Sequence, residues 1–299
     1  MAIAIILLWW QGTLNDLTST ARDVDPGRLI VIFLLYLAGL ALLCLRWYVL
    51  IRVADGAADV PRAAEAFLTS VVVNYAAPIG LAIPTRALLS SRDLGLTVAS
   101  SGAVAIWEVA LDTLVLVAIG AAWLVVGERI AIDPVLANPA LTIAAMLVVV
   151  AGLLLVGMIV WRRPRLRQRL QVAGKATLRY PVRHPGLACG ALILSLLYWG
   201  AQGVTLALLL DAVGSERTPT LGLILGLLGF PVLIGMFSPV PGGAGVREAL
   251  MVAVAQASGF DGAAVLLAAI AYRVALFVAI PPLYLAARVW RAVRTGDRS

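Results

Sequence analysis

The sequence predicts an all-α, polytopic membrane protein of about six to eight transmembrane helices, with two broken or re-entrant helix pairs in an inverted repeat. Hydrophobic residues account for 62% of the 299 residues and charged residues for only 13%, about half of the charged fraction of a soluble domain. Two apolar segments also contain the same pattern, in which a proline precedes an arginine by eight positions. Charge at membrane depth is costly and is usually retained for function, so the repeated pattern predicts a functional element in each half.

Each expected crossing is an apolar run, because a membrane-spanning helix needs about 20 predominantly apolar residues. The runs that cross are residues 29–53, 96–126, 139–161, 186–210 and 263–289. We expect residues 1–299 to form a single transmembrane domain, with halves at approximately 29–126 and 186–289 joined by 127–185.

Two more pairs of apolar segments are interrupted by proline and glycine. In the first pair, residues 63–77 and 79–91 meet at Pro78–Gly80, and each segment is short for a full crossing, since fifteen residues reach only about 22 Å of a core of about 30 Å. The second pair, residues 220–237 and 244–258, is long enough to cross. Topology alone does not separate re-entrant pairs from fully spanning ones, because both leave the later helices in the same direction.

The distribution of arginine predicts the orientation of the chain. Arginine and lysine gather in the connector 162–183 and at the C-terminus, which places both on the cytoplasmic side of the plasma membrane. The connectors 128–133 and 211–217 are mixed or acidic and are expected outside. The first interrupted pair then opens from the cytoplasm and the second from outside, as an inverted repeat requires.

The far end of the first span is expected to lie at the membrane surface. Arg46 is followed by Trp47 and Tyr48, a combination typical of an interfacial anchor. Together with Arg52 and Arg62, Arg46 assigns the connector after this span to the cytoplasm.

The two arginines of the repeated pattern, Arg86 and Arg247, are the candidate lipid- or phosphate-binding cations. A guanidinium group near free backbone N–H groups at a helix start suits a phosphate. Glycines let a head group approach the backbone closely, and a polar side chain at the first break can satisfy freed backbone groups or contact the ligand. The other candidates for this site are Gly242, Gly243, Gly245 and Asn74. The alternative for each arginine is that it extends to the interface or pairs with an internal acid.

Four more charged residues are expected to face the protein interior as charge partners or proton carriers. Glu108 and Asp112 lie four positions apart on one long apolar helix and therefore share a face. Their expected counter-ions are Arg86, Arg247 or Arg273, and a structural salt bridge and proton coupling remain open alternatives. Glu248 directly follows Arg247.

No cofactor or metal site is expected. His184 is the only histidine, and Cys44 and Cys189 lie far apart in apolar runs. The net charge of +7 comes almost entirely from arginines in connectors, which we interpret as a topology signal, so nucleic acid is not an expected partner.

The charged and proline-rich positions together resemble the transmembrane region of the lysylphosphatidylglycerol synthase/flippase family. The residues that carry the resemblance are Asn74, Pro78, Arg86, Glu108, Asp112, Pro239 to Glu248, Tyr272 and Arg273. The resemblance implies a polytopic lipid-handling module that moves phospholipids or polyprenyl-linked lipids between leaflets. Because the chain ends at Ser299, the aminoacyl-transferase domain is not expected, nor is enzymatic activity. Ala82 and Ile83 stand where the family commonly has glycine and an acid.

Our leading hypothesis is therefore a flippase for a membrane lipid with an anionic head group, which Arg86 and Arg247 bind between the interrupted pairs. The first alternative is a small-solute or ion-coupled secondary transporter, with Glu108 and Asp112 as ion ligands. The second alternative is an accessory subunit of a separate lipid-modifying enzyme. An intramembrane enzyme is disfavoured because the sequence offers no nucleophile–base arrangement.

Overall fold

Helices make up all the regular structure in the part of the chain that the computed structural model describes. The described residues are 26–54, 59–76, 96–126, 181–213, 217–238 and 240–296, with a few isolated positions between 92 and 179. The predicted all-α membrane class is confirmed. The total number of spans and the inverted repeat stay predictions, and the expected crossing at 139–161 lies outside the described residues.

Four of the described helices are long and apolar enough to cross a membrane. They are α3 (Pro26–Val53), α6 (Val98–Val126), α10 (Pro185–Ala212) and α14 (Gly262–Gly296). They coincide with the expected spans at 29–53, 96–126, 186–210 and 263–289. α14 extends several residues beyond its predicted end and contains Pro281 and Pro282.

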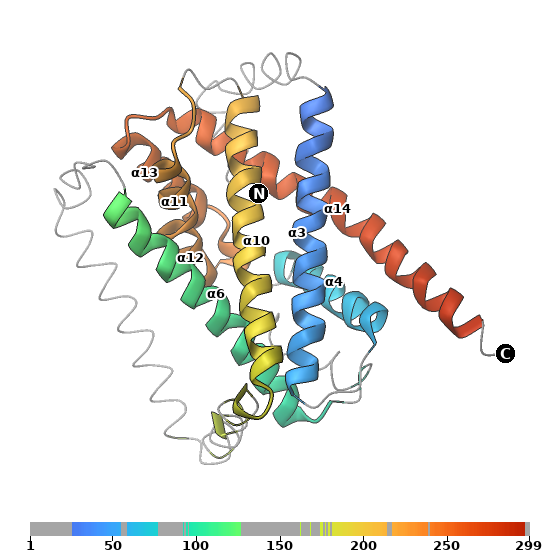
Figure 1. The fold of residues 1–299 in the computed structure, drawn as a ribbon. Coiled ribbons are helices and arrows are strands. Elements are labelled where there is room, and N and C mark those ends of the chain that lie inside the picture. Colours follow the sequence, from blue (N-terminus) through green and yellow to red (C-terminus); the bar gives the residue numbers. More distant parts are fainter. Residues whose placement is uncertain are drawn as a thin grey trace.

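Helices α3 and α10 lie side by side and run in opposite directions (Figure 1). At one end, Arg28 near the start of α3 donates a hydrogen bond of 2.9 Å to Asp211 near the end of α10. Farther along, Gly39 faces Gln202, whose amide nitrogen lies 2.8 Å from where a Cβ atom on Gly39 would be. The absence of a side chain at Gly39 therefore lets the two helices approach closely.

The second interrupted pair is built from four short helical segments. These are α11 (Leu221–Leu228), α12 (Phe230–Phe237), the 3₁₀ turn η1 (Pro241–Gly243) and α13 (Val246–Ala257). The break between α11 and α12 at Gly229 was not predicted. Pro231 explains it, because proline has no backbone N–H and its ring disrupts a continuing helix.

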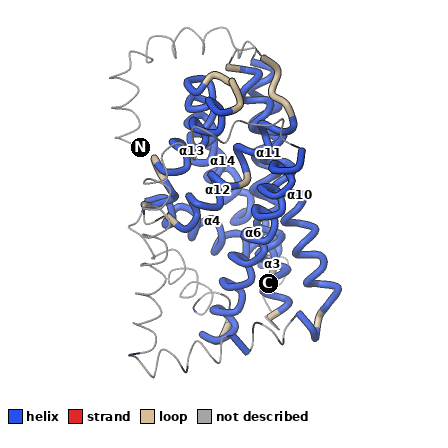
Figure 2. The backbone as a smooth tube through the Cα atoms, turned by 90° about the vertical axis from the view of Figure 1, so that its left-hand side faces the viewer, coloured by secondary structure: helices blue, strands red, loops and turns tan. Residues whose placement is uncertain are grey.

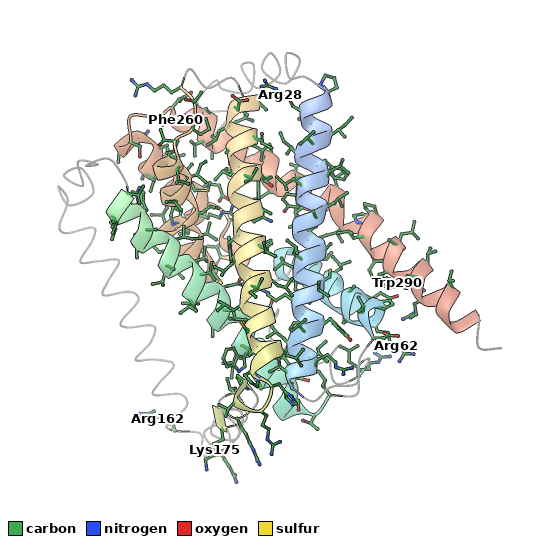
Figure 3. The ribbon with its side chains drawn as sticks, in the orientation of Figure 1. Arg28, Arg62, Arg162, Lys175, Phe260 and Trp290 are labelled. Carbon is green, nitrogen blue, oxygen red and sulfur yellow. The ribbon has the colours of Figure 1, made fainter. Side chains whose placement is uncertain are left out.

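This second pair returns to the end at which it began. Arg217, just before α11, donates a hydrogen bond of 3.2 Å to the carbonyl of Gly259, just after α13. Figure 3 places Phe260 at the upper end of the molecule and Lys175 at the lower end, and we call these the Phe260 end and the Lys175 end. The second pair thus enters from the Phe260 end, turns at η1 and leaves at the same end.

The first interrupted pair begins from the opposite direction. Its described half, α4 (Val60–Ala76), starts in the lower part of the molecule near Arg62 and runs inward (Figures 1 and 3). α4 contacts both η1 and α14, and the labels of α4, α12 and α14 lie together near the middle in Figure 2. The remaining half, including Pro78 and Arg86, lies outside the described residues.

Helix α6 supports the second pair through a very close contact. A Cβ atom on Gly229 would lie 2.7 Å from the Cα atom of Gly120 in α6. Nearby, Trp123 of α6 packs edge-on against Phe230, with ring centroids 5.8 Å apart. Backbone meets backbone here, so neither helix has a flexible side chain that can move aside.

We predict that Gly229→Ala destabilises the protein by about 1–3 kcal/mol, the usual cost of overpacking, because the new methyl group collides with the backbone of α6. Unfolding in detergent micelles measures the effect. The matched control is Gly200→Ala in α10, where a Cβ atom has nothing within 4 Å. Equal stability of the two variants would contradict the close contact.

Candidate functional site

The most buried cation of the described residues is Arg46 in α3. Only 2% of its surface is exposed, and it lies seven positions inside the end of α3. The expectation that Arg46 anchors the chain at the interface is therefore wrong. Trp47 beside it is also buried, so the Arg–Trp pair faces the protein rather than the membrane surface.

Arg46 binds the two acids of α6. Its Nη1 and Nη2 atoms donate to the two carboxylate oxygens of Asp112 at 2.5 and 2.9 Å. Glu108 lies 3.6 Å from Nη2, one turn earlier on the same face. The predicted shared face of the two acids is thus confirmed, but the cation that the structure places against both is Arg46 and not Arg247 or Arg273.

Helix α10 completes this buried cluster. Ser195 accepts a hydrogen bond from Arg46 at 3.1 Å, and Trp199 donates one to Asp112 at 3.0 Å. The cluster of Arg46, Glu108, Asp112, Ser195 and Trp199, which we call the ionic cluster, joins α3, α6 and α10. Charges out of water need such hydrogen-bonded partners, so the cluster fixes how the three helices fit together.

A second polar centre surrounds the turn between α12 and α13. Arg273 of α14 donates from Nε to Glu248 at 2.6 Å and from Nη2 to the carbonyl of Gly242 at 2.9 Å. The other carboxylate oxygen of Glu248 accepts a hydrogen bond of 2.7 Å from the backbone of Gly245. Arg273 and Glu248 thus hold the turn at both ends, and α14 positions it.

The turn itself depends on glycine. Gly242, Gly243 and Gly245 all have positive φ angles, which other residues adopt at a cost. A Cβ atom on Gly243 would also lie 2.5 Å from the carbonyl oxygen of Gly235 in α12. The glycine-rich pattern of the sequence therefore reflects a tight backbone turn that returns against α12.

Arg247 stands in the first turn of α13, next to this polar centre. Its guanidinium carbon lies 5.1 Å from the centre of the Tyr272 ring, a cation–π distance. Tyr272 in turn donates a hydrogen bond to Gln202 and packs edge-on against Tyr36 at 5.0 Å between ring centres. Arg247 is half-buried, and its guanidinium group lies against Tyr272 of α14, which in turn contacts α3 and α10.

The structure groups the predicted residues into two sets. One set lies around the glycine turn: Gly242, Gly243, Gly245, Arg247, Glu248 and Arg273. The other set is Glu108 and Asp112 in the ionic cluster. Asn74 lies in the last part of α4, and Arg86 lies outside the described residues, so convergence of the two arginines is untested.

Sequence reasoning missed the role of Arg46. It predicts a hydrogen bond between helices for Gln202, which the structure confirms, but does not identify Tyr272 as the partner. A signal for Arg46 existed: two acids four positions apart in a span require a cation, and the preceding span contains one. Within the described residues, no group of three or more histidine, cysteine or acidic side chains is arranged to hold a metal ion.

Comparison with known protein families finds one that matches most of the chain. The family model described as "Lysylphosphatidylglycerol synthase TM region" matches residues 1–282, which include the ionic cluster and the glycine turn. No curated protein matches the chain.

We predict that Arg46→Ala destabilises the protein by about 3–5 kcal/mol, because the buried Glu108 and the half-buried Asp112 are left without their cation. The control is Arg52→Ala, an exposed position on the same helix, with an expected change of less than about 0.5 kcal/mol. Unfolding in detergent measures both. If Arg46 contributed only as a surface residue, the two variants would be equally stable.

The turn generates a second prediction. Gly243→Ala and Gly245→Ala both incur the left-handed backbone cost of about 1–2 kcal/mol, but only Gly243→Ala also collides with Gly235. Gly243→Ala is therefore expected to be the more destabilising variant in thermal unfolding. The reverse order would mean that the turn does not contact α12 as described.

Proposed function

Because the chain belongs to the lysylphosphatidylglycerol synthase transmembrane-region family, we propose that it is a lipid flippase. The family connects this multi-pass membrane protein with membrane lipids. The finer proposal is that it moves an anionic phospholipid or a polyprenyl-phosphate-linked lipid between leaflets. No covalent bond changes in this process, so the protein acts as a transporter and not as an enzyme, and a separate lipid-modifying enzyme supplies the lipid.

The observation that carries this proposal is the contact between α4, the described half of the first pair, and the turn η1 of the second pair. The α11–α13 unit enters from the Phe260 end and turns at η1, and α4 enters from the lower half and contacts η1. Non-helical backbone at membrane depth is tolerated where it lies within protein or lines a cavity. Interrupted helices that meet near the middle of the membrane are a common arrangement of substrate sites in transporters.

The charge at this meeting point favours an anionic substrate. Two of the three charged side chains at the turn, Arg247 and Arg273, are cations and one, Glu248, is an acid, so together they carry one net positive charge. The start of α13 contributes a partial positive charge at the same place. We propose that Arg247 and the backbone of Gly242, Gly243 and Gly245 bind a phosphate group, with Arg86 and Asn74 contributing from the first pair.

Movement is proposed to follow from the opposed entry of the two pairs. The ionic cluster holds α3, α6 and α10 as one unit, and the interrupted pairs shift against it, opening in turn to each side. The basic Lys175 end, with Arg62 and Arg162 in the same half, faces the cytoplasm of the cell in this proposal, by the positive-inside rule (Figure 3). The C-terminus is then also cytoplasmic.

Reconstituted transport tests the proposal. We expect proteoliposomes that contain the protein to move a labelled phosphatidylglycerol between leaflets, and Arg247→Gln to lower the rate about tenfold, the effect of losing about 1.4 kcal/mol of interaction with the moving phosphate. A leaflet-selective quenching assay measures the rate. Arg86→Gln is expected to act in the same direction.

The matched control for transport is Arg28→Gln, which removes the same charge at the Phe260 end. Arg28 is exposed and pairs with Asp211, far from the glycine turn. If Arg247→Gln transports lipid at the wild-type rate, Arg247 does not bind the moving phosphate. Absence of lipid movement with folded wild-type protein would overturn the flippase proposal itself.

A further inference from the structure

An open region lies along the last part of α14, beyond Pro281 and Pro282. It is an open cavity of about 370 Å³ lined by Arg288, Val289, Arg291 and Ala292. Figure 1 shows this part of α14 passing α4 and extending away from the other helices. All four lining residues belong to α14, so the cavity is open on its other sides and is separate from the glycine turn.

One wall of the cavity is fixed by an ion pair. Arg291 donates a hydrogen bond of 2.8 Å from Nη1 to Oε2 of Glu65 in α4. The Glu65 side chain is only 13% exposed, whereas that of Arg291 is 36% exposed. Glu65 therefore orients the Arg291 guanidinium, part of which remains accessible.

The cavity has more cations than acids within the described residues. Arg288 lies one turn before Arg291 on the same side of α14 and is exposed, and no ion pair joins it to another described residue. The negative charge of Glu65 offsets the charge of one of the two arginines, so Glu65, Arg288 and Arg291 together carry one net positive charge. Two guanidinium groups one turn apart can bind a phosphate from two sides.

The surroundings suit a lipid and not a free ion. Leu285, Val289 and Val293 form an exposed apolar stripe along the same stretch of α14. Trp290 is half-exposed on this stretch, and Figure 3 shows it in the same half of the molecule as Arg62. Tryptophan and arginine are typical of the level of lipid head groups, and the apolar stripe offers contacts for acyl chains.

We propose that Arg288 and Arg291 form a binding site for the phosphate of an anionic phospholipid head group, separate from the glycine turn. The site lies beyond residues 1–282, to which the family match extends. The bound phosphate competes with Glu65 for Arg291. Because Glu65 belongs to α4, the first half of an interrupted pair, lipid at this site weakens the contact between α14 and α4.

Lipid retention tests the proposal without any transport measurement. The purified protein is equilibrated with equal amounts of phosphatidylglycerol and phosphatidylcholine, which share the phosphate but differ in net charge, and the retained lipids are counted by native mass spectrometry. We expect Arg288→Gln to lower the retained ratio of phosphatidylglycerol to phosphatidylcholine several-fold. Glu65→Gln is expected to raise it, because Arg291 is released toward the cavity.

The matched control is Arg52→Gln, which removes the same charge from an exposed position on α3 and is not among the residues that line the cavity. Its ratio is expected to stay at the wild-type value. The proposal is overturned if Arg288→Gln and Arg52→Gln give the same ratio, or if Glu65→Gln lowers it. Because Arg247 belongs to the proposed transport site, Arg247→Gln is expected to remove that site's own share of the retained phosphatidylglycerol. Adding Arg288→Gln to Arg247→Gln is then expected to lower the ratio further, so the retention test gives its result even where the flippase test fails.

Discussion

The buried contact of Arg46 with Asp112 is the interaction on which the arrangement of the long helices depends. Removing a guanidinium and a carboxylate from water is costly, and the cost is offset only when both groups are fully hydrogen-bonded. Asp112 accepts hydrogen bonds from Arg46 and Trp199. Arg46 in turn donates to Asp112 and Ser195 and lies close to Glu108. These partners come from α3, α6 and α10, so the three helices have one mutual position that satisfies all of them. Apolar packing between helices does not fix their mutual position as strongly, because apolar side chains contact lipid tails as favourably as they contact each other.

The two polar centres differ in what they hold. The ionic cluster joins side chains of three long helices, whereas the centre at Arg273 holds a backbone turn through Gly242 and Gly245. A side-chain cluster between continuous helices makes a rigid unit. The glycine turn is held locally, by Arg273, by Glu248 and by the close contact of Gly243 with Gly235. The structure thus combines a fixed scaffold with a locally held element.

The sequence predicted the features that depend on local chemistry. Apolar length defined α3, α6, α10 and α14, and the glycine-rich segment predicted the turn before α13. Pairing was harder, because it depends on which helices become neighbours. Arg46 was assigned to the interface since Trp47 and Tyr48 follow it, yet Arg46 and Trp47 lie two turns before the end of α3 and are buried among the other helices. The break at Gly229 was detectable from Pro231, but the surrounding residues are so apolar that one continuous helix was the simpler interpretation.

The close approach of Gly243 to Gly235 limits how this protein can diverge. At both positions a larger residue meets backbone or Cβ atoms that cannot rotate aside, so the path of the chain through the turn is the same for every tolerated sequence. In the proposed flippase, changes in head-group preference would then arise at neighbouring side chains, such as the one at Ala244, which is only partly covered. Evolution and engineering alike would alter selectivity there while the loop backbone stayed constant.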